Sequence, residues 1–571
     1  MDNLQFYCVN DAKMHTAPLG TPVGEIAVSC GIHLVNPVTG EEEPVLAALV
    51  DHKLKELSYK MVVSHEVQFI GYSHPDGRRC YNSSLVFVLQ KAVRDLFPDK
   101  VLIALHSLPG GLYLELVESR RNADGHRPVW FIPDEDVDRL HARMREIVDA
   151  DLPFGKEKMR YEDAREIFLS NNQPYKAELM ESLGRYVTSV YSLDDTRDTF
   201  YGPLVPSTGL LKVFGLYGFN SGVCLQLPSY GDRDVLMPVR RQSKISATLR
   251  DYAEWCLSMD ILGVGNLNNV IQNGGAVPLI NLTEARHERK YAEIADMIFQ
   301  RRGQIRIVFI AGPSSSGKTS SSLRIANQCR TLGLNPKVIE LDNYFRNRED
   351  TPKDENGQYD FESLQAMELD LLNSQLNSLL EGEEVEIPHF NFKTGQREAS
   401  GRKLRLGEKD LLIMEGIHAL NPDMTPSVDN SRIFRIYASA LTSLGIDENN
   451  SISTSDNRLL RRIVRDNRIR GITPEETINR WHSVRRGESR NIFPFQENAD
   501  AFFNSALIYE FPLLRYYAEP LLRRIAPNSP AYTEAVRLLK FLSFIVPLAP
   551  SEIEAIPPTS ILREFIGGQT L

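Results

Sequence analysis

Over the first 70 residues, short apolar stretches alternate with turn residues. The runs EIAVSC (25–30), PVLAALV (44–50) and EVQFI (66–70) predict short strands, since each is apolar and bounded by turn formers. Residues 50–57, VDHKLKEL, predict a strand, a tight turn and a second strand. We therefore expect a small β-rich domain over residues 1–70.

Residues 71–235 mix helical and strand periods. In 83–97, apolar residues recur at the spacing of one helix face, and 134–154 opens on acidic residues before a helical pattern. Residues 110–117, GGLYLELV, alternate as a strand does. This combination predicts an α+β domain.

Two further segments have a mainly helical pattern. Residues 236–303 read as a helical connector that ends in a helix over 283–302, capped by Thr283. The last 46 residues, 526–571, read as a helical extension at the end of the chain.

Residues 304–525 alternate apolar strands with helices. The run IRIVFIAG (305–312) is continuously apolar, as expected of a strand buried on both faces, and 320–333 predicts the helix that follows it. This alternation predicts an α/β domain with a mostly parallel sheet. Its other predicted strands are 337–342, 410–416, 432–439 and 506–511.

Composition narrows the class of protein. The hydrophobic fraction is 42% and the charged fraction 25%, which are ordinary values for a globular protein, and the net charge of −10 disfavours a general nucleic-acid binder. The six cysteines form no CxxC pair, so we expect reduced thiols. The N-terminus lacks the pattern of a secretory signal, and the apolar run 541–549 is too short to cross a membrane. We expect a cytoplasmic protein without a membrane contact.

The strongest chemical signal is GPSSSGKT at 312–319, which follows an apolar strand and opens a helix. Glycines let such a loop point its backbone N–H groups at phosphate oxygens, and the helix adds its positive N-terminal end. Lys318 would reach the outer phosphates, and Thr319 would offer its hydroxyl to Mg²⁺. The pattern therefore predicts a site for a nucleoside triphosphate with Mg²⁺, but by itself it does not distinguish a kinase from a GTPase or a motor ATPase. The expected nucleotide-binding residues are Gly312, Ser314, Ser315, Ser316, Gly317, Lys318, Thr319 and Ser320.

Two acidic residues stand at the ends of two predicted apolar strands. Asp342 and Glu415 would lie at the ligand edge of the sheet, where the carboxyl ends of parallel strands meet. Asp342 could accept the proton of an attacking hydroxyl and help to order Mg²⁺. Glu415 stands where an acidic group holds Mg²⁺ directly or through water.

Ten arginines and no lysine lie between residues 458 and 490. Arginines on a closing lid can stabilise the charge that develops during phosphoryl transfer. Of the six in RLLRRIVRDNRIRG (458–471), we assign this catalytic role to Arg462, Arg465 and Arg470, and we interpret the others as a solvated basic face.

The C-terminal half resembles the uridine kinase family of P-loop kinases. The matching stretches, in order, are IAGPSSSGKTSSS, LDNYF, GQYDFESLQAMELD, EIPHFNFKTGQR, LLIMEGIHAL and RLLRRIVRDNRIRG, and the late strand follows ENAD. The resemblance implies phosphate transfer from ATP to a nucleoside 5′-hydroxyl. It makes Asp342 the catalytic aspartate, Glu415 the metal-associated glutamate and Arg462 an arginine near the acceptor.

The departures from the family pattern lie on the acceptor side. The family binds its nucleoside with a YDFxxHxR stretch, which here begins at Phe390, has Gly395 at the histidine and ends at Arg397. Glu362 replaces an acceptor-binding aspartate, and Ile472 replaces an arginine. A site built to hydrogen-bond a base loses much of its specificity when such partners are missing. We expect the acceptor to be bound by Glu362, Phe390, Arg397 and Arg462, but these residues do not identify it.

The N-terminal half has a resemblance of its own. Residues 1–70 resemble a TGS domain, through VLAALVDHKLKEL and EVQFI. Residues 71–235 resemble the editing domain of threonyl-tRNA synthetase, through SSLVFVLQKAVRDLFPD, GGLYLEL, REIVDADLPF and YGPLVPSTG. That editing site needs an HxxxH pair and a CxxxH pair, which are metal-type ligands. The four positions here are Ser83, Phe87, Phe200 and Leu204, so we expect no editing hydrolase.

The sequence therefore predicts a P-loop kinase with a mostly parallel sheet, preceded by a TGS-like domain and an editing-like domain. The first hypothesis is a kinase for a uridine-like nucleoside. A second is a kinase for another hydroxyl acceptor such as a sugar phosphate, which Arg485, Arg486 and Arg490 could meet. A third is an ATP-binding, RNA-associated regulator. The first half lacks the dense mixture of basic and aromatic residues that would support RNA binding. The sequence leaves open whether the protein forms a homo-oligomer.

Overall fold

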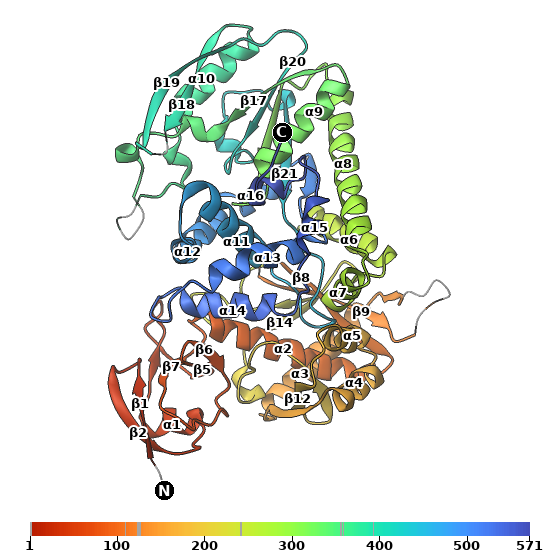
Figure 1. The fold of residues 1–571 in the computed structure, drawn as a ribbon, viewed down its shortest axis with the longest axis vertical. Coiled ribbons are helices and arrows are strands. Elements are labelled where there is room, and N and C mark those ends of the chain that lie inside the picture. Colours follow the sequence, from red (N-terminus) through yellow and green to blue (C-terminus); the bar gives the residue numbers. More distant parts are fainter. Residues whose placement is uncertain are drawn as a thin grey trace.

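The computed structural model describes residues 3–108, 110–120, 122, 127–239, 242–353, 357, 359–391 and 393–571. The chain is elongated (Figure 1). The N-terminal half lies at one end, the sheet that carries the P-loop lies at the other, and the helices near the C-terminus lie between them.

The first sheet is the small β-rich unit expected at the N-terminus. Its strands are β1 (Asn3–Cys8), β2 (Lys13–Pro18), β5 (Ala47–Val50), β6 (Lys53–Lys55) and β7 (Glu66–Ile70), in the order β2-β1-β7-β5-β6. The two-stranded pair β3 (Leu34–Val35) and β4 (Glu42–Glu43) lies beside it. The predicted strand at 25–30 is wrong. Val23–Ser29 forms helix α1, because Val23, Ile26 and Ala27 recur at helical spacing and are buried.

The next unit combines antiparallel strands with two long helices. Helices α2 (Pro75–Leu96) and α3 (Asp134–Asp149) pack together, and α3 also contacts β14. The sheet contains β8 (Lys100–Leu108), β9 (Gly111–Glu118), β10 (Val129–Trp130), β14 (Gly215–Phe219) and β15 (Gly222–Gln226). A second sheet has β11 (Gly155–Arg160), β12 (Val187–Leu193) and β13 (Thr196–Asp198), with α4 (Tyr161–Ser170) and α5 (Pro174–Ser182).

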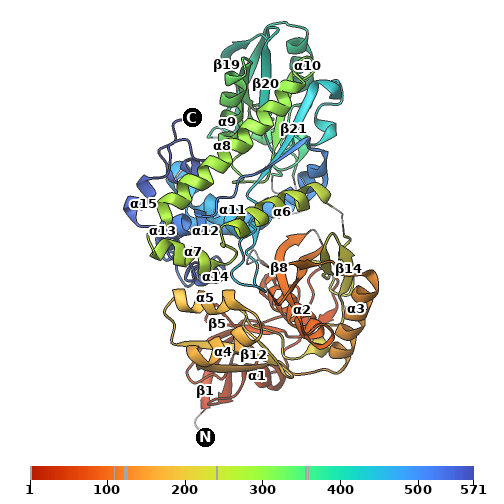
Figure 2. The ribbon, with the colours of Figure 1, turned by 90° about the vertical axis from the view of Figure 1, so that its right-hand side faces the viewer.

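The connector is helical, as predicted. It contains α6 (Ser243–Ser258), α7 (Val264–Gln272) and α8 (Ala276–Gln300). Helix α8 begins before the predicted position and runs along the P-loop sheet, where it packs on α9 (Figure 2).

The P-loop sheet is entirely parallel, with the order β17-β20-β16-β21-β22. The strands are β16 (Ile307–Ala311), β17 (Asn335–Glu340), β20 (Asp410–Glu415), β21 (Ile433–Ser439) and β22 (Ala501–Asn504). The predicted strand at 506–511 is wrong. The last strand ends at Asn504, and the apolar residues after it are buried in a turn that leads into α13 (Glu510–Leu522).

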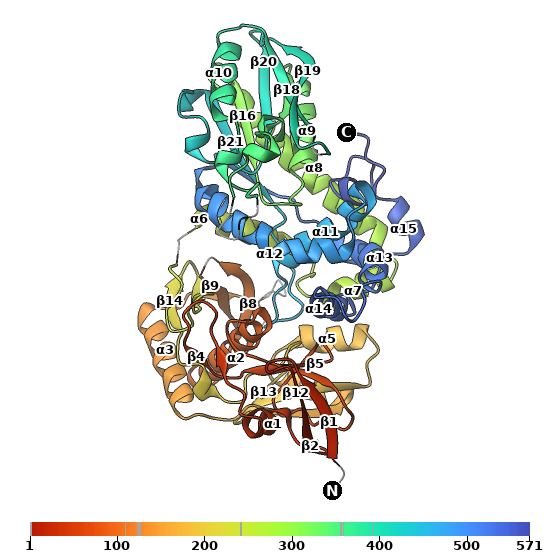
Figure 3. The same ribbon diagram turned by 90° about the vertical axis from the view of Figure 1, so that its left-hand side faces the viewer.

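Helices and one hairpin surround this sheet. They are α9 (Lys318–Thr331), α10 (Leu369–Leu380), the β18 (Val385–Asn391) and β19 (Gln396–Leu404) hairpin, α11 (Thr454–Arg465) and α12 (Pro474–Asn491). The chain ends with α14 (Tyr532–Leu542), α15 (Pro550–Glu554) and α16 (Arg563–Ile566). Figure 3 shows α11, α12 and α14 between the two halves.

A buried polar cluster joins the halves. Lys176 lies 2.6 Å from the Asp198 carboxylate, and both side chains are fully buried. The loop between β21 and α11 adds Asp447, Glu448 and Asn449, and the Glu448 carbonyl accepts a 2.7 Å hydrogen bond from the Ala104 N–H. Burial raises the pKa of Glu448 to about 8, and Lys176 opposes this shift. The loop that precedes α11 is therefore anchored in the N-terminal half.

No described helix is long and apolar enough to cross a membrane. The domain limits near residues 70, 235, 303 and 525 stay predictions.

Candidate active site at the P-loop

The P-loop backbone has a shape that only particular residues allow. A Cβ on Gly312 would lie 2.0 Å from the Ala438 carbonyl oxygen, so no larger residue fits there. Gly317 has a φ of 82° and directly precedes α9, and Ser315 also has a positive φ of 60°. These angles belong to the left-handed region, which favours glycine. The loop is thus folded tightly between β16 and α9.

The loop also has polar groups without protein partners. The hydroxyls of Ser315 and Ser316 are buried and make no hydrogen bond. The first N–H groups of α9 have no acceptor within the helix. The Lys318 amino group lies 3.4 Å from the Pro313 carbonyl oxygen. Buried polar groups need partners, and phosphate oxygens would provide them, so these residues fit a nucleotide phosphate chain.

Glu415 at the end of β20 contacts the P-loop threonine. The Thr319 hydroxyl donates a 2.6 Å hydrogen bond to the Glu415 carboxylate. Burial raises the pKa of Glu415 to about 7, and the charge of Lys318 opposes that shift. A hydroxyl beside a carboxylate is a donor set that suits Mg²⁺.

Asp342 lies in the 3₁₀ turn Leu341–Tyr344, directly after β17. Burial raises the pKa of the Asp342 carboxyl, and Lys318 opposes the shift, as Arg470 does more weakly. The charge of Lys318 thus acts on both Asp342 and Glu415, so these three predicted residues belong to one electrostatic group.

Glu362 belongs to the same group of charges. Burial raises its pKa to about 7, Glu488 adds to the shift, and Arg462 and Lys318 oppose it. The Glu362 side chain packs against α12 at Gly487, where a Cβ would lie 2.4 Å from the Glu362 Cβ. The structure thus brings this predicted acceptor-side residue close to Lys318.

Asp466 lies close to the three arginines to which the sequence analysis assigned a catalytic role. Its buried carboxylate lies 3.2 Å from Arg462, 2.8 Å from Arg465 and 3.6 Å from Arg470. Residues Asp466–Arg470 form one π-helical turn, which ends at Gly471 with a φ of 65°. Arg462 also donates a 2.8 Å hydrogen bond to the Ser314 hydroxyl, which joins this group to the P-loop.

The interpretation of the remaining arginines as a solvated face is wrong for Arg458 and Arg461. Both are buried, and they pair with Glu488 and Glu510 at 2.5 Å. The Arg458 guanidinium also donates to the Ser314 carbonyl at 3.1 Å. These two arginines lie among the apolar residues of α11. Their buried ion pairs support the P-loop. Their partners are distant along the chain, so no local pattern could have predicted these two pairs.

Two predicted acceptor residues lie outside this group of charges. Phe390 is buried against Phe345, with ring centroids 5.7 Å apart. The Arg397 guanidinium lies 3.4 Å from the Glu368 carboxylate. Among the described residues, no ion pair joins Arg397 to the P-loop group. Phe392, in the same stretch, lies outside the described residues.

His418 is a residue that the sequence analysis did not include in the site. It follows Glu415 by three positions and is almost fully buried, and the backbone of Ser363 approaches its ring. Burial lowers its pKa to about 4, so the ring is neutral at pH 7. A buried imidazole near the substrate edge of the sheet was not predictable from spacing alone.

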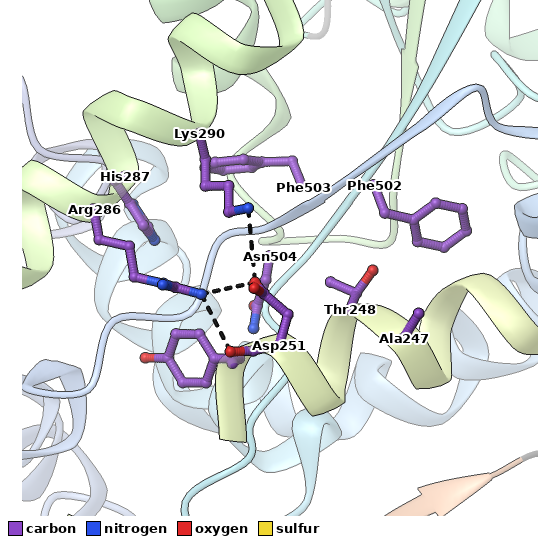
Figure 4. A pocket seen from close by; sticks show the side chains of 10 residues that line it. Ala247, Thr248, Asp251, Arg286, His287, Lys290, Phe502, Phe503 and Asn504 are labelled. Carbon is purple, nitrogen blue, oxygen red and sulfur yellow. Dashed lines mark hydrogen bonds and ion pairs between the residues drawn. The ribbon is translucent and has the colours of Figure 1, made fainter. Parts of the chain in front are cut away.

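A cavity of about 260 Å³ lies elsewhere, between α6, α8 and β22. Figure 4 shows Arg286 and Lys290 of α8 reaching Asp251 of α6, at 2.7 and 3.8 Å. This cavity contains none of the residues that the sequence predicted for catalysis or nucleotide binding.

None of the four residues at the positions of the editing-site ligands has a metal-type side chain. Phe87 and Phe200 contact each other, with ring centroids 5.2 Å apart, and both are buried with Leu204. Phe87 of the first pair of positions and Phe200 and Leu204 of the second thus lie in an apolar cluster. Among the described residues, the one group of His, Cys and carboxylate ligands close enough for a metal is Cys8, Asp11 and His15, in the first sheet.

Comparison with known proteins matches the two halves to different families. Residues 307–508 match the model of the Phosphoribulokinase / Uridine kinase family. The N-terminal half is similar to threonine–tRNA ligases. That of Symbiobacterium thermophilum is 26% identical over 217 residues (38% of this chain, 31% of the ligase), and that of Desulforamulus reducens is 30% identical over 205 residues (36% and 30%). The chain thus spans about a third of the length of these curated relatives.

Some of the solved structures that are similar to part of this chain are described as kinases. One, described as a possible uridine kinase from Bacillus stearothermophilus, has 17% identity and a TM-score of 0.27, and covers 38% of this chain and 99% of its own. A D-glycerate 3-kinase from Cryptococcus neoformans has 12% identity and a TM-score of 0.19, with 44% and 87% covered. The fold class predicted from the sequence, a P-loop kinase sheet after a β-rich N-terminal region, is confirmed.

Proposed function

We propose that this protein is an ATP-dependent, Mg²⁺-dependent kinase that phosphorylates a hydroxyl of a small molecule, with a nucleoside 5′-hydroxyl as the first candidate. The observation that carries this proposal is the position of Lys318. Its charge acts on Asp342, Glu362 and Glu415, so the phosphate-binding lysine is surrounded by the carboxylates that a kinase needs.

Each residue has a defined role in this proposal. Asp342, whose pKa is raised by burial, accepts the proton of the acceptor hydroxyl, since a base works best when its pKa approaches the working pH. Lys318 and Arg462 stabilise negative charge on the transferred phosphoryl group. Thr319 and Glu415 hold Mg²⁺, which neutralises phosphate charge when bound.

The acceptor could instead be anionic, such as a sugar phosphate. Two observations favour this alternative. Phe390, which replaces a tyrosine of the family pattern, is packed on Phe345 and offers no polar group to a base. Three arginines share the single carboxylate of Asp466, so this cluster has guanidinium groups that could pair with the phosphate of an acceptor. The family match over 307–508 fits both alternatives, because the family includes phosphoribulokinases as well as uridine kinases, and the nucleoside stays first only because the sequence motifs resemble those of uridine kinases.

The third hypothesis, an ATP-binding regulator of RNA, has less support. The Lys318, Thr319, Asp342 and Glu415 side chains of a working kinase are all retained and are brought together. The N-terminal half is similar to threonine–tRNA ligases, but Ser83, Phe87, Phe200 and Leu204 at its editing-ligand positions offer no metal-type ligand. We assign it the role of supporting the kinase half.

One assay tests these alternatives. The purified chain is incubated with MgATP and a panel of nucleosides, neutral sugars and sugar phosphates, and products are identified by mass spectrometry. Phosphorylation of a nucleoside supports the first candidate, and phosphorylation of a sugar phosphate alone replaces it with the second. The Lys318→Ala variant is the control, and we expect it to transfer no phosphate. Activity of that variant equal to wild type would show that the product arises elsewhere.

A further inference from the structure

The last residues of the chain pack directly against the P-loop. The Ser320 hydroxyl donates a 2.6 Å hydrogen bond to the Glu564 carboxylate and accepts a 2.8 Å hydrogen bond from the Gln569 side-chain amide. A Cβ on Gly317 would lie 2.3 Å from the Ile561 Cδ1, so this methyl group lies against the loop. The segment 556–571 therefore borders the phosphate cradle, although the sequence predicted only a helical extension.

This segment is firmly held. Ile561, Leu562 and Phe565 are fully buried in the same apolar core as the strands of the P-loop sheet. Arg468 donates to the carbonyl oxygens of Phe565 and Glu564 at 3.0 and 2.9 Å. Displacing the segment would expose this apolar surface and break these bonds, so it is a fixed wall rather than a movable lid.

The wall lies at a defined end of the nucleotide site. In a P-loop the lysine reaches the outer phosphates and the next hydroxyl faces the metal, while the backbone N–H groups hold the inner phosphates. Ser320 is one residue further into α9 than Thr319, so it marks the end where the nucleoside begins. A carboxylate repels phosphate oxygens but accepts hydrogen bonds from hydroxyls, and acidic residues hold ribose hydroxyls in other nucleotide sites.

From this geometry we propose that the segment 556–571 forms the ribose-binding wall of the donor site, with Glu564 accepting a hydrogen bond from a ribose hydroxyl and Gln569 holding Ser320 in place beside it. This inference rests on the proposed function, because it assumes that the phosphate donor is a nucleoside triphosphate. It adds to the site two residues that lie outside the part of the chain matched to the kinase family.

Calorimetric titration of the full chain, without an acceptor, tests the proposal with three Mg²⁺ complexes: ATP, 2′,3′-dideoxy-ATP and tripolyphosphate. A hydrogen bond to a charged group gives about tenfold or more in affinity, so wild type binds ATP at least about tenfold more tightly than dideoxy-ATP. Glu564→Gln brings this ratio below about threefold, with tripolyphosphate affinity within about threefold of wild type. Glu554→Gln, an exposed carboxylate in the same part of the chain, leaves the ratio unchanged.

Two results overturn the proposal. One is a Glu564→Gln protein that keeps the wild-type ratio, and the other is a variant that binds ATP and tripolyphosphate more tightly to the same degree, since Glu564 would then only repel phosphate. If Glu564→Gln does not fold, Gln569→Ala, at a partly exposed side chain, must lower the ratio at least about twofold. A chain that phosphorylates an acceptor without ribose discrimination contradicts this inference alone. A chain that discriminates but phosphorylates nothing contradicts the proposed function alone.

Discussion

The Thr319 hydroxyl and the Glu415 carboxylate are 2.6 Å apart, and this hydrogen bond joins the first turn of α9 to the end of β20. Both groups are the proposed ligands of Mg²⁺. Because burial raises the pKa of Glu415 to about 7, a large fraction of this carboxyl is protonated at neutral pH and cannot bind a cation in that form.

Mg²⁺ binding should therefore depend on pH. Protons compete with Mg²⁺ for Glu415, so we expect the affinity for Mg²⁺ in the presence of ATP to rise between pH 6 and 8, with proton release on binding. Calorimetry in buffers of different ionisation enthalpy measures this release. In Glu415→Gln the affinity should be weak and should lose most of this pH dependence. An equally steep profile in that variant would contradict the role of Glu415.

The same carboxyl should influence stability with a defined sign. Its folded pKa, about 7, lies above the ordinary value of 4.5, so its contribution to stability is fully present below about pH 4.5 and is lost as the pH rises through 7. Without ligand, we expect Glu415→Gln to gain stability relative to wild type between pH 5 and 8, by up to roughly 3 kcal/mol. Thermal unfolding at both pH values measures this gain. A difference that does not change with pH would be inconsistent with a raised pKa.

Asp342→Asn separates catalysis from binding. The amide cannot accept the acceptor proton, so turnover should fall by roughly 10²- to 10⁴-fold while ATP affinity changes by less than about threefold. Steady-state kinetics and calorimetry provide the two measurements. Asp370→Asn, at an exposed carboxylate of α10, is a control that should keep turnover within about twofold. Near-normal turnover of Asp342→Asn would remove Asp342 from the role of base.

The buried ion pair between Arg461 of α11 and Glu510 of α13 offers a test of whether such pairs support the P-loop. Their side chains are 0% and 1% exposed, and Arg461 also donates to the Ser505 carbonyl at 2.8 Å. Arg461→Met leaves a buried carboxylate unpaired, so we expect a loss of about 3–5 kcal/mol in the free energy of unfolding. Arg523→Gln, which breaks an exposed pair with Glu519, should cost at most about 1 kcal/mol. Equal effects in urea titrations would exclude a supporting role.

The parts of the fold that depend on local pattern were predictable. The P-loop strand, its helix and the acidic ends of β17 and β20 follow from short stretches whose apolar periods and turn residues agree. Where a short apolar run fitted both the helical and the strand period, tertiary packing decided which secondary structure formed. Residues 25–30 became helical because the apolar face of α1 packs in the first core, and 506–511 became a buried turn because the sheet already ends at Asn504.

The partners of the site were not predictable from the sequence. Glu488 and Glu564 contact Ser314 and Ser320 from positions at least 168 residues further along the chain, and Glu510 pairs with Arg461 of α11. Nothing in their local sequence distinguishes these three residues from surface carboxylates. The arginine assignment shows the same limit. Spacing placed Arg462, Arg465 and Arg470 together, but it could not show that Arg458 and Arg461 point into the core.

The former editing site should not respond to zinc. Phe87, Phe200 and Leu204 stand at three of the four ligand positions and are buried apolar side chains that cannot bind a metal, so wild type should hydrolyse no aminoacyl-tRNA when zinc is added. A hydrolysis assay with mischarged tRNA, run beside an active threonyl-tRNA synthetase, makes this measurement. Zinc-dependent hydrolysis by this chain would overturn the assignment of a lost activity.

Lys176 tests whether the two halves act as one unit. It is fully buried and neutralises Asp198, and Asp447 and Asn449 of the loop that leads into α11 approach it as well. Lys176→Met leaves unpaired carboxylates, so we expect unfolding to become easier by about 3–5 kcal/mol, whereas Lys158→Met, at an exposed site, should change stability by about 0.5 kcal/mol or less. Adding Asp198→Asn to Lys176→Met removes one unpaired charge and should restore part of the loss. Because the same loop positions the helix that bears Arg462, kinase turnover should fall in Lys176→Met and recover in the double variant. A stability loss without any change in turnover would show that the N-terminal half supports folding but not catalysis.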